Sequence, residues 1–244
     1  MSLLHAIIAK HLHCDQVCIL NLRGLPLSKN IKLMLVMLIS LLLATSLFYL
    51  LLSVPAVTQL NIDLFLWINQ FYWSPLAQVV AVLEEVDTFA FLALVIALIH
   101  FKKHNVAMAI LVAILIETLF TVAVNHVFVQ PRPFQVLTGI DFAFQPYGYS
   151  FPSGHAARMI AAFTAWCVLE KKYYLPFIIL AVLLCISRVY IGVHWPMDSI
   201  AGAVMGLIIG YVVAKLNLNP LLVRLTDLIH RIKARFKRKG NLTA

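Results

Sequence analysis

Charged residues are scarce in this chain of 244 residues. Aspartate, glutamate, lysine and arginine make up 12% of the sequence, whereas 62% of it is hydrophobic. A soluble domain contains roughly a quarter charged and about half apolar residues. The shortage of charge therefore excludes an ordinary soluble domain, and a mean hydropathy of +0.93 indicates an integral membrane protein.

The chain also lacks cysteines at a spacing that would suggest a disulfide framework or a CxxC motif. Cys14 and Cys18 lie in the amino-terminal tail, whereas Cys167 and Cys185 fall inside hydrophobic stretches. This pattern predicts buried, reduced thiols. Internal repeats and low-complexity linkers are absent from the sequence too, which indicates a single domain.

Six hydrophobic stretches can be drawn along the chain. They cover residues 31–53, 81–101, 105–129, 154–170, 174–192 and 197–215. A helix that spans a membrane needs roughly 20 mostly apolar residues. The sequence therefore predicts an all-α bundle of six transmembrane helices over residues 31–217. A cytoplasmic tail of residues 1–30 precedes this lipid-embedded domain, and a basic cytoplasmic tail of residues 218–244 follows it.

The net charge of +9 does not indicate nucleic acid as a partner, because much of the excess follows the last hydrophobic stretch, in the segment RLTDLIHRIKARFKRKG. A basic segment beside a membrane span is typical of a cytoplasmic tail on anionic lipid. Two interpretations stay open for this segment. It lies amphipathically in the interface, or it is a solvated orientation signal.

Lysine and arginine also predict the orientation of the chain. With the amino terminus in the cytoplasm, 16 of the 19 basic residues fall on the cytoplasmic side, all except Arg132, Arg158 and Arg188. This asymmetry agrees with the positive-inside rule. We therefore expect a multi-pass protein of the plasma (inner) membrane. The three exceptions lie at or near the opposite face, which we expect to hold an active site on the periplasmic, extracytoplasmic side.

Three short blocks of polar residues lie at the outer ends of the predicted spans. The first block is residues 130–133 (QPRP), the second is 151–155 (FPSGH), and the third is 187–198 (SRVYIGVHWPMD). Ionisable groups at a membrane site are costly and are functional candidates for that reason. Two arginines, two histidines, two serines and an aspartate thus gather at one face.

These residue types suit phosphoryl transfer, which needs fixed cations around the developing charge. The guanidinium groups of Arg132 and Arg188 supply that charge in a planar, bidentate form. We place Pro152 in the first turn of the fourth span. The N–H groups of Ser153 and Gly154, with the serine hydroxyl, would then close on the phosphate.

A nucleophile and a proton donor complete the predicted site. His194 stands four residues before Asp198. A carboxylate on one ring nitrogen fixes the imidazole tautomer and leaves the other nitrogen to attack phosphorus. A second histidine, His155, is placed to protonate the leaving oxygen of the lipid.

Together the three blocks resemble the tripartite signature of the type 2 phosphatidic acid phosphatase superfamily. That signature reads K-x6-R-P, P-S-G-H and S-R-x5-H-x3-D, and ten of its eleven fixed positions match in order over residues 125–198. The resemblance implies hydrolysis of a lipid phosphate through a phosphohistidine, without a metal or another cofactor. It implies that His194 is the nucleophile, Asp198 the carboxylate that orients it and His155 the general acid. The phosphate binders that it implies are Arg132, Ser153, Gly154 and Arg188.

One position departs from the signature, since Asn125 stands where the family has lysine. An asparagine can still donate a hydrogen bond to phosphate but carries no charge. Arg158, three residues after His155, is a candidate to compensate. Glu117 precedes Asn125 on a polar stripe of the same predicted helix. It either pairs with Arg158 or makes a structural contact within the bundle, and we favour the structural contact.

We therefore expect a phosphatase whose partners are a lipid phosphate substrate and membrane lipids. Undecaprenyl diphosphate, phosphatidylglycerol phosphate, phosphatidic acid and lipid A phosphates are all candidate substrates. Two alternatives remain. One is a phosphotransferase that passes the phosphate to a second lipid, and the other is a lipid-binding or flipping protein without turnover. The sequence gives no indication of an oligomeric state.

Overall fold

The computed structural model describes residues 28–223 except 86–93, 97, 100 and 173. Within this part of the chain every regular element is a helix, which confirms the all-α prediction. Most of the predicted amino-terminal tail, with Cys14 and Cys18, and the basic segment from residue 224 onward lie outside the described residues. Cys167 and Cys185 are free thiols, as predicted, but only Cys167 is buried and Cys185 is partly exposed.

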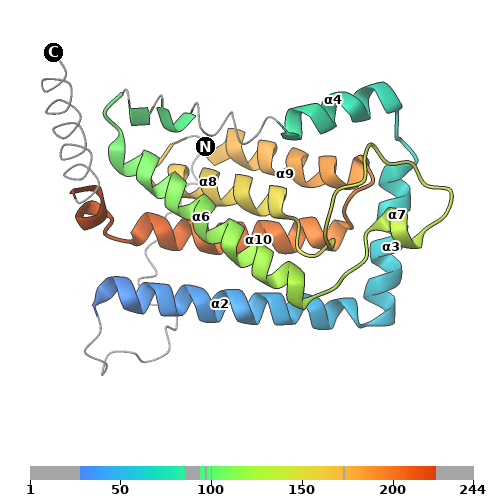
Figure 1. Cartoon of the computed structure of the whole chain (residues 1–244), viewed down its shortest axis with the longest axis horizontal. Helices are drawn as coiled ribbons and strands as arrows, with labels where there is room; N and C mark the ends of the chain where they lie inside the picture. The colour runs from blue at the N-terminus through green and yellow to red at the C-terminus, as the bar shows by residue number, and fades with distance from the viewer. Residues whose placement is uncertain (1–27, 86–93, 97, 100, 173, 224–244) are drawn as a thin grey trace, which may run out of the picture.

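Five helices run side by side in the bundle (Figure 1). They are α2 (Lys29–Leu52), α6 (His104–Val127), α8 (Gly154–Glu170), α9 (Tyr174–Tyr190) and α10 (Pro196–Lys215). Helix α10 lies at the centre and packs on all four of the others. The predicted stretches at 31–53, 105–129, 154–170, 174–192 and 197–215 therefore correspond closely to these helices.

Small residues bring α10 and α8 unusually close together. A Cβ atom added to Gly202, Gly206 or Gly210 would lie only 2.3 to 2.4 Å from a carbonyl oxygen of α8 or of the residue that caps it. Glycine at every fourth position forms one face of a helix, and small residues on such a face let two backbones approach in a membrane. The close approach sets the start of α8 against the start of α10.

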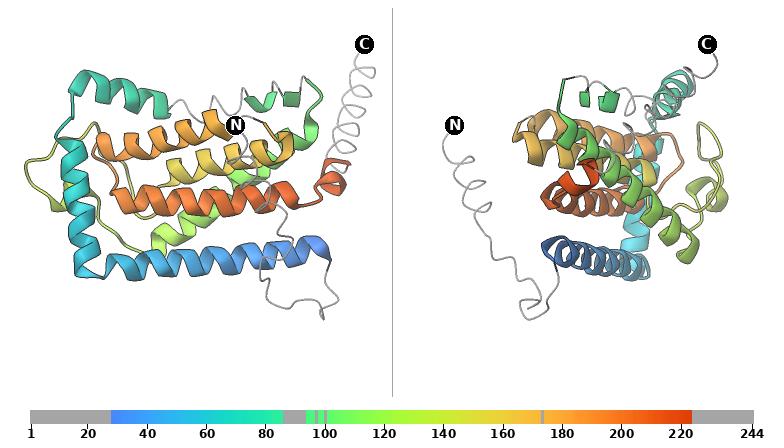
Figure 2. Two further views of the ribbon diagram at one scale, coloured as in Figure 1. Left: turned by 180° about the vertical axis from the view of Figure 1, so that it is seen from behind. Right: turned by 60° about the vertical axis from the view of Figure 1, so that its left-hand side comes forward.

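The segment between α2 and α4 (Ser74–Glu85) was not predicted as a helix. It forms α3 (Pro55–Asn69), which stands across one end of the bundle (Figure 2). Its buried residues Asn61, Phe65 and Asn69 recur every four positions, so that one face packs on the bundle. Polar residues interrupt its sequence, which is why no continuous apolar stretch marks it.

The described residues contain three helices that are long and apolar enough to cross a membrane, namely α2, α6 and α10. Helix α9 and the first ten residues of α4 are apolar but shorter. The second predicted span began at residue 81, whereas α4 already begins at Ser74; part of this span lies outside the described residues. The structure thus supports several apolar helices without establishing six crossings.

Candidate active site

The three blocks converge at the end of the bundle that α3 crosses (Figure 1). The first block lies between α6 and the short helix α7 (Pro133–Val136), the second leads into α8, and the third joins the end of α9 to the first turn of α10. Direct hydrogen bonds connect them. The Ser153 N–H donates to the Asp198 carbonyl at 3.1 Å, and the Trp195 Nε1–H donates to the Pro131 carbonyl at 2.9 Å.

His194 and Asp198 face each other as the sequence predicted. The distance from His194 Nδ1 to Asp198 Oδ2 is 3.6 Å, and both side chains are buried. Asp198 Oδ2 also accepts the Trp195 N–H at 2.9 Å and the hydroxyl of Ser150. The carboxylate is therefore fixed in the first turn of α10.

Arg132 lies on the other side of the imidazole. Its Nη1 lies 3.4 Å from His194 Nε2 and donates to the Val193 carbonyl at 2.8 Å. Its remaining nitrogens donate to the carbonyls of Tyr147, Gly148 and Tyr149. Burial lowers the pKa of Arg132 to about 10, although the charge of Asp198 opposes this shift. The guanidinium therefore stays charged at neutral pH.

These contacts determine the tautomer of His194. A guanidinium has only donors, so Nε2 must be the acceptor and the ring proton must sit on Nδ1. Burial lowers the pKa of His194 well below its usual value, and the charges of Arg188, Arg132 and His155 lower it further, against a hydrogen bond to the Ser150 backbone. The imidazole is therefore neutral, with the lone pair of Nε2 on the side of Arg132.

The start of α8 departs in one respect from the sequence prediction. Helix α8 begins at Gly154 with Ser153 as its N-cap, so Pro152 lies before the first turn and not in it. The Ser153 N–H already donates to the Asp198 carbonyl. The buried Ser153 hydroxyl has no hydrogen-bond partner among the described residues. This hydroxyl and the N–H of Gly154, which no helical carbonyl can reach, are the groups left for an anion.

His155 and Arg188 border an apolar groove beside the site. The groove has a volume of about 290 Å³ and lies between α4, α8 and α9. Its apolar lining residues are Val80, Leu83, Ala156, Met159, Leu180, Leu183 and Leu184. His155, the predicted general acid, and Arg188, a predicted phosphate-binding residue, thus lie where the apolar groove meets the polar site.

Asn125 is placed differently from a phosphate ligand. Its Nδ2 donates to the carbonyls of Tyr149 at 3.1 Å and Phe151 at 3.0 Å, and its Oδ1 accepts the Tyr149 N–H at 2.9 Å. The amide thus holds the loop that leads into the second block. Phosphate binding by Asn125 would require these bonds to be given up.

Glu117 and Arg158 lie deeper in the bundle. Glu117 is fully buried on α6 and accepts the Thr121 hydroxyl at 2.6 Å. The charge of Arg158 acts on this carboxylate. Arg158 Nη1 also lies 3.4 Å from the place that a Cβ on Gly154 would take. Arg158 therefore lies near both Glu117 and the start of α8.

Ser150 is the residue of the site that the sequence did not reveal. It is fully buried, and its Oγ lies beside both Asp198 Oδ2 and His194 Nδ1. Ser150 precedes the second block in a loop rich in aromatic residues, and nothing in its local pattern distinguishes it from other loop serines. Only the convergence of three segments reveals the contact.

Comparison with known proteins identifies the family. The sequence profile of the PAP2 superfamily matches residues 106–220. An undecaprenyl-diphosphatase of Sulfolobus acidocaldarius is 31% identical over 150 residues, which cover 60% of this chain and 73% of that protein. A lipid A 1-phosphatase of Rhizobium etli is 40% identical over 70 residues, which cover 27% of this chain and 30% of that protein.

A solved structure supports the same assignment. The crystal structure of LpxE from Aquifex aeolicus superimposes with a TM-score of 0.58 and 28% sequence identity, and it covers 64% of this chain and 96% of that chain. The sequence profile, the relatives and the fold agree with the convergent blocks. The chain therefore belongs to the PAP2 superfamily, and it is a lipid phosphate phosphatase.

Proposed function

We propose that this phosphatase hydrolyses a polyprenyl-type lipid diphosphate through a phosphohistidine on His194. The observation that carries the proposal is that a polar site around His194 adjoins an apolar groove. The neutral imidazole lies beside Arg132 and within the field of Arg188 and His155. His155 and Arg188 in turn border an apolar groove that can take a lipid chain.

The proposed reaction has two steps. Nε2 of His194 bonds to phosphorus while the bond from phosphorus to the leaving oxygen breaks, and His155 gives that oxygen a proton. The oxygen of a water molecule then bonds to phosphorus while the bond from phosphorus to Nε2 breaks, and His155 takes a proton from this water. Inorganic phosphate leaves, and the imidazole of His194 is neutral again. The charge on the equatorial oxygens is stabilised by Arg188 and the groups at the start of α8, which can contact them directly. Arg132 adds its positive charge from beside the imidazole, because its five N–H groups already have acceptors.

Two features favour a polyprenyl diphosphate over lipids with bulky head groups. The longest described segment outside the helices at this end is residues 137–153, too short to form a separate head-group domain. The undecaprenyl-diphosphatase relative matches over 73% of its own length. Lipid A 1-phosphate is the second candidate, because the relative of that name has the higher identity over its shorter match.

Phosphate release from a lipid panel tests this proposal. The purified protein is assayed on undecaprenyl diphosphate, lipid A 1-phosphate, phosphatidylglycerol phosphate and phosphatidic acid, with and without EDTA. We expect the highest kcat/KM on undecaprenyl diphosphate, no loss with EDTA, and no turnover by His194→Ala. A clear preference for another lipid would overturn the substrate assignment, and turnover by His194→Ala would overturn the mechanism.

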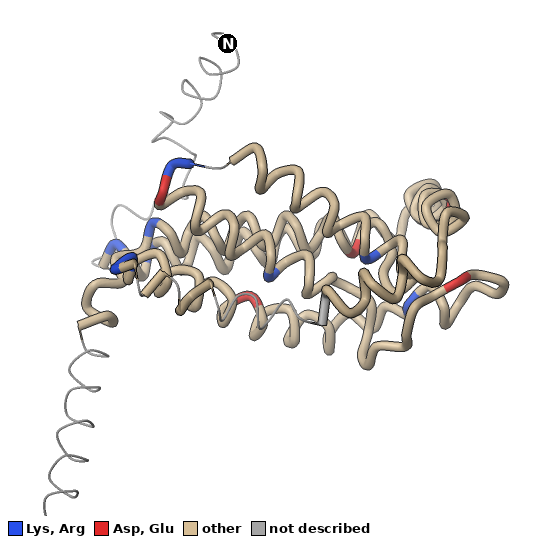
Figure 3. The backbone as a smooth tube through the Cα atoms, turned by 90° about the horizontal axis from the view of Figure 1, so that it is seen from above, with Lys and Arg blue, Asp and Glu red and all other residues tan. Residues whose placement is uncertain are grey.

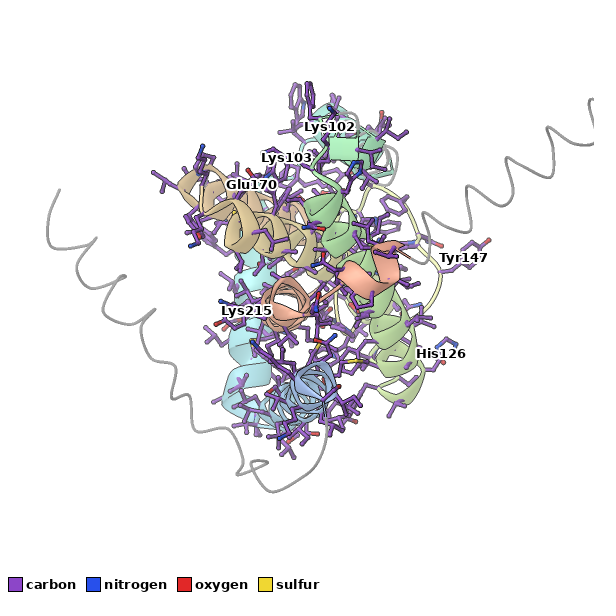
Figure 4. All side chains as sticks on the ribbon, turned by 90° about the vertical axis from the view of Figure 1, so that its left-hand side faces the viewer. Lys102, Lys103, His126, Tyr147, Glu170 and Lys215 are labelled. Carbon is purple, nitrogen blue, oxygen red and sulfur yellow. The ribbon has the colours of Figure 1, made fainter. Side chains whose placement is uncertain are left out.

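We also propose that six segments cross the membrane and that the site faces the periplasm. Lysines and arginines gather mainly at one end of the bundle (Figure 3). That end includes Lys102, Lys103 and Lys215, which are labelled in the end-on view (Figure 4). The site lies at the other end. The positive-inside rule then places the site outside the cytoplasm, with α3 along the outer interface.

A further inference from the structure

The hydroxyl of Ser150 occupies the space between the two residues that form the nucleophilic pair. Ser150 donates to Asp198 Oδ2, and its Oγ lies 3.4 Å from His194 Nδ1. The direct distance from His194 Nδ1 to Asp198 Oδ2 is 3.6 Å. This direct distance is too long for a hydrogen bond, so the shorter connection between imidazole and carboxylate passes through the serine.

The proton positions along this connection follow from the chemistry of the groups. The Ser150 hydroxyl donates its proton to Asp198 Oδ2. The lone pairs of the hydroxyl oxygen are then free to accept the Nδ1–H of His194, which also bonds to the backbone of Ser150. The same tautomer follows from Arg132, which requires Nε2 to be the acceptor. Two independent contacts thus place the ring proton on Nδ1.

We propose that Ser150 is a positioning residue for the reaction, as the middle member of a His194–Ser150–Asp198 relay. The hydroxyl holds the imidazole in the reactive tautomer and orients Nε2 toward phosphorus. When Nε2 bonds to phosphorus the imidazole becomes cationic, and no proton leaves Nδ1. The aligned hydroxyl dipole and the charge of Asp198 stabilise that cation. This inference rests on the proposed phosphohistidine mechanism.

The backbone of Ser150 has a separate structural role, which allows the two functions to be separated. Its N–H donates to the Gln130 carbonyl at 2.8 Å and so joins the loop to the first block. Substitution to alanine keeps this bond and removes only the hydroxyl. Substitution to cysteine keeps a side chain of similar size, but a thiol is a weak donor and acceptor.

The first experiment compares the two Ser150 variants with a control serine. We expect Ser150→Ala and Ser150→Cys to lower kcat by roughly tenfold to a hundredfold, the value of a hydrogen bond to a charged group, with little change in KM. Ser199→Ala is the control, because Ser199 is also buried, adjoins Asp198 and makes no hydrogen bond through its hydroxyl to the described residues. It should retain the kcat of the parent.

The second experiment tests whether Ser150 acts through its two neighbours. Ser150→Ala is combined with Asp198→Asn, and acid-quenched single turnovers measure the formation of phosphohistidine. Residues that share one role are strongly non-additive. We therefore expect the alanine to slow phosphohistidine formation much less in the Asp198→Asn background than in the parent.

Several results would overturn the relay. These are full kcat in Ser150→Ala, near-parent kcat in Ser150→Cys, or equal losses from the alanine in both backgrounds. Failure of the underlying mechanism is distinguishable, because the parent protein would then carry no acid-labile phosphate on His194. A parent that labels normally, with Ser150→Ala labelling at the same rate, would contradict only the role of the serine.

Discussion

The imidazole of His194 is neutral in the resting enzyme because burial and three neighbouring cationic or ionisable groups all disfavour its charged form. A neutral imidazole has a free lone pair, so the surroundings that make protonation costly also keep His194 in the form that the proposed mechanism needs. Arg132 stays charged under the same burial, since its pKa falls only to about 10. The site thereby combines a neutral nucleophile with a permanent cation.

The depressed pKa of His194 predicts how stability changes with pH. In the unfolded chain this histidine gains a proton below about pH 6.5, whereas in the folded protein it stays neutral to lower pH. The unfolded state therefore binds more protons below pH 6.5, and folding loses stability as the pH falls through that range. We expect His194→Gln, which cannot titrate, to show a smaller fall in Tm between pH 8 and pH 5.5 than the parent. Equal falls in both proteins would contradict a depressed pKa.

Asn125 is predicted to act on the loop and not as a charged ligand. Asn125→Ala removes two donated and one accepted hydrogen bond to the backbone of residues 149–151. We expect a loss of about 1–3 kcal/mol in the free energy of unfolding and a higher KM. Asn125→Asp is the matched variant, because its carboxylate would face two carbonyl oxygens and should be less stable than alanine. Unchanged Tm in both variants would show that the loop does not depend on this amide.

Among the elements, the seam between α8 and α10 has the strongest influence on the site. Ser153 and Asp198 are far apart in the sequence, in the second and third blocks, so local structure alone does not bring them together. The glycines of α10 allow the two helix starts to meet, and the Ser153 N–H then reaches the Asp198 carbonyl. Helix α3 supports the same region, since Asn61 accepts the Met197 N–H at 2.9 Å.

Two glycines of this seam provide a comparison at the element scale. A Cβ at Gly202 would lie 2.4 Å from the Ser153 carbonyl oxygen, and one at Gly210 would lie 2.3 Å from that of Ala161. Both substitutions to alanine force the helices apart, so we expect similar losses in Tm. Only Gly202→Ala moves the start of α8 against Asp198, and it should lower kcat more than Gly210→Ala does. Equal effects on kcat would argue against the seam as the element that aligns the site.

At the scale of the whole molecule, polarity separates the two ends of the bundle. One end has the lysines and the Lys103–Glu170 ion pair at 2.5 Å. The other end has the buried arginines and the exposed Tyr147, whose side chain projects away from the bundle (Figure 4). Opposite ends of a membrane bundle face different compartments, so this separation defines an orientation that labelling can test.

A single cysteine in a background without the four native cysteines tests the orientation. We expect Tyr147→Cys to react with an impermeant thiol reagent in intact cells, because Tyr147 is fully exposed at the end that holds the site. Lys215→Cys, at the exposed carboxyl end of α10, should react only after the cells are permeabilised. The reverse pattern would place the active site in the cytoplasm.

The helical class, most of the long helices and the residues of the three blocks could be predicted from the amino-acid sequence. Apolar runs and helix-capping residues are local features, and the spacing of His194 and Asp198 places them within one turn of each other. The sequence missed α3 because its polar residues break the apolar run, although its buried face recurs every four residues.

How the three blocks meet depends on the packing of the folded chain. The contact of Ser150 with Asp198 joins residues 48 positions apart, and the amide of Asn125 binds a loop 24 to 26 positions away. No local pattern encodes such contacts, because they depend on how segments far apart in the sequence pack. The glycines of α10 set one of these distances, that between α8 and α10. Packing therefore sets the contacts around the imidazole of His194, whereas the motif alone predicts that His194 and Asp198 belong to one site.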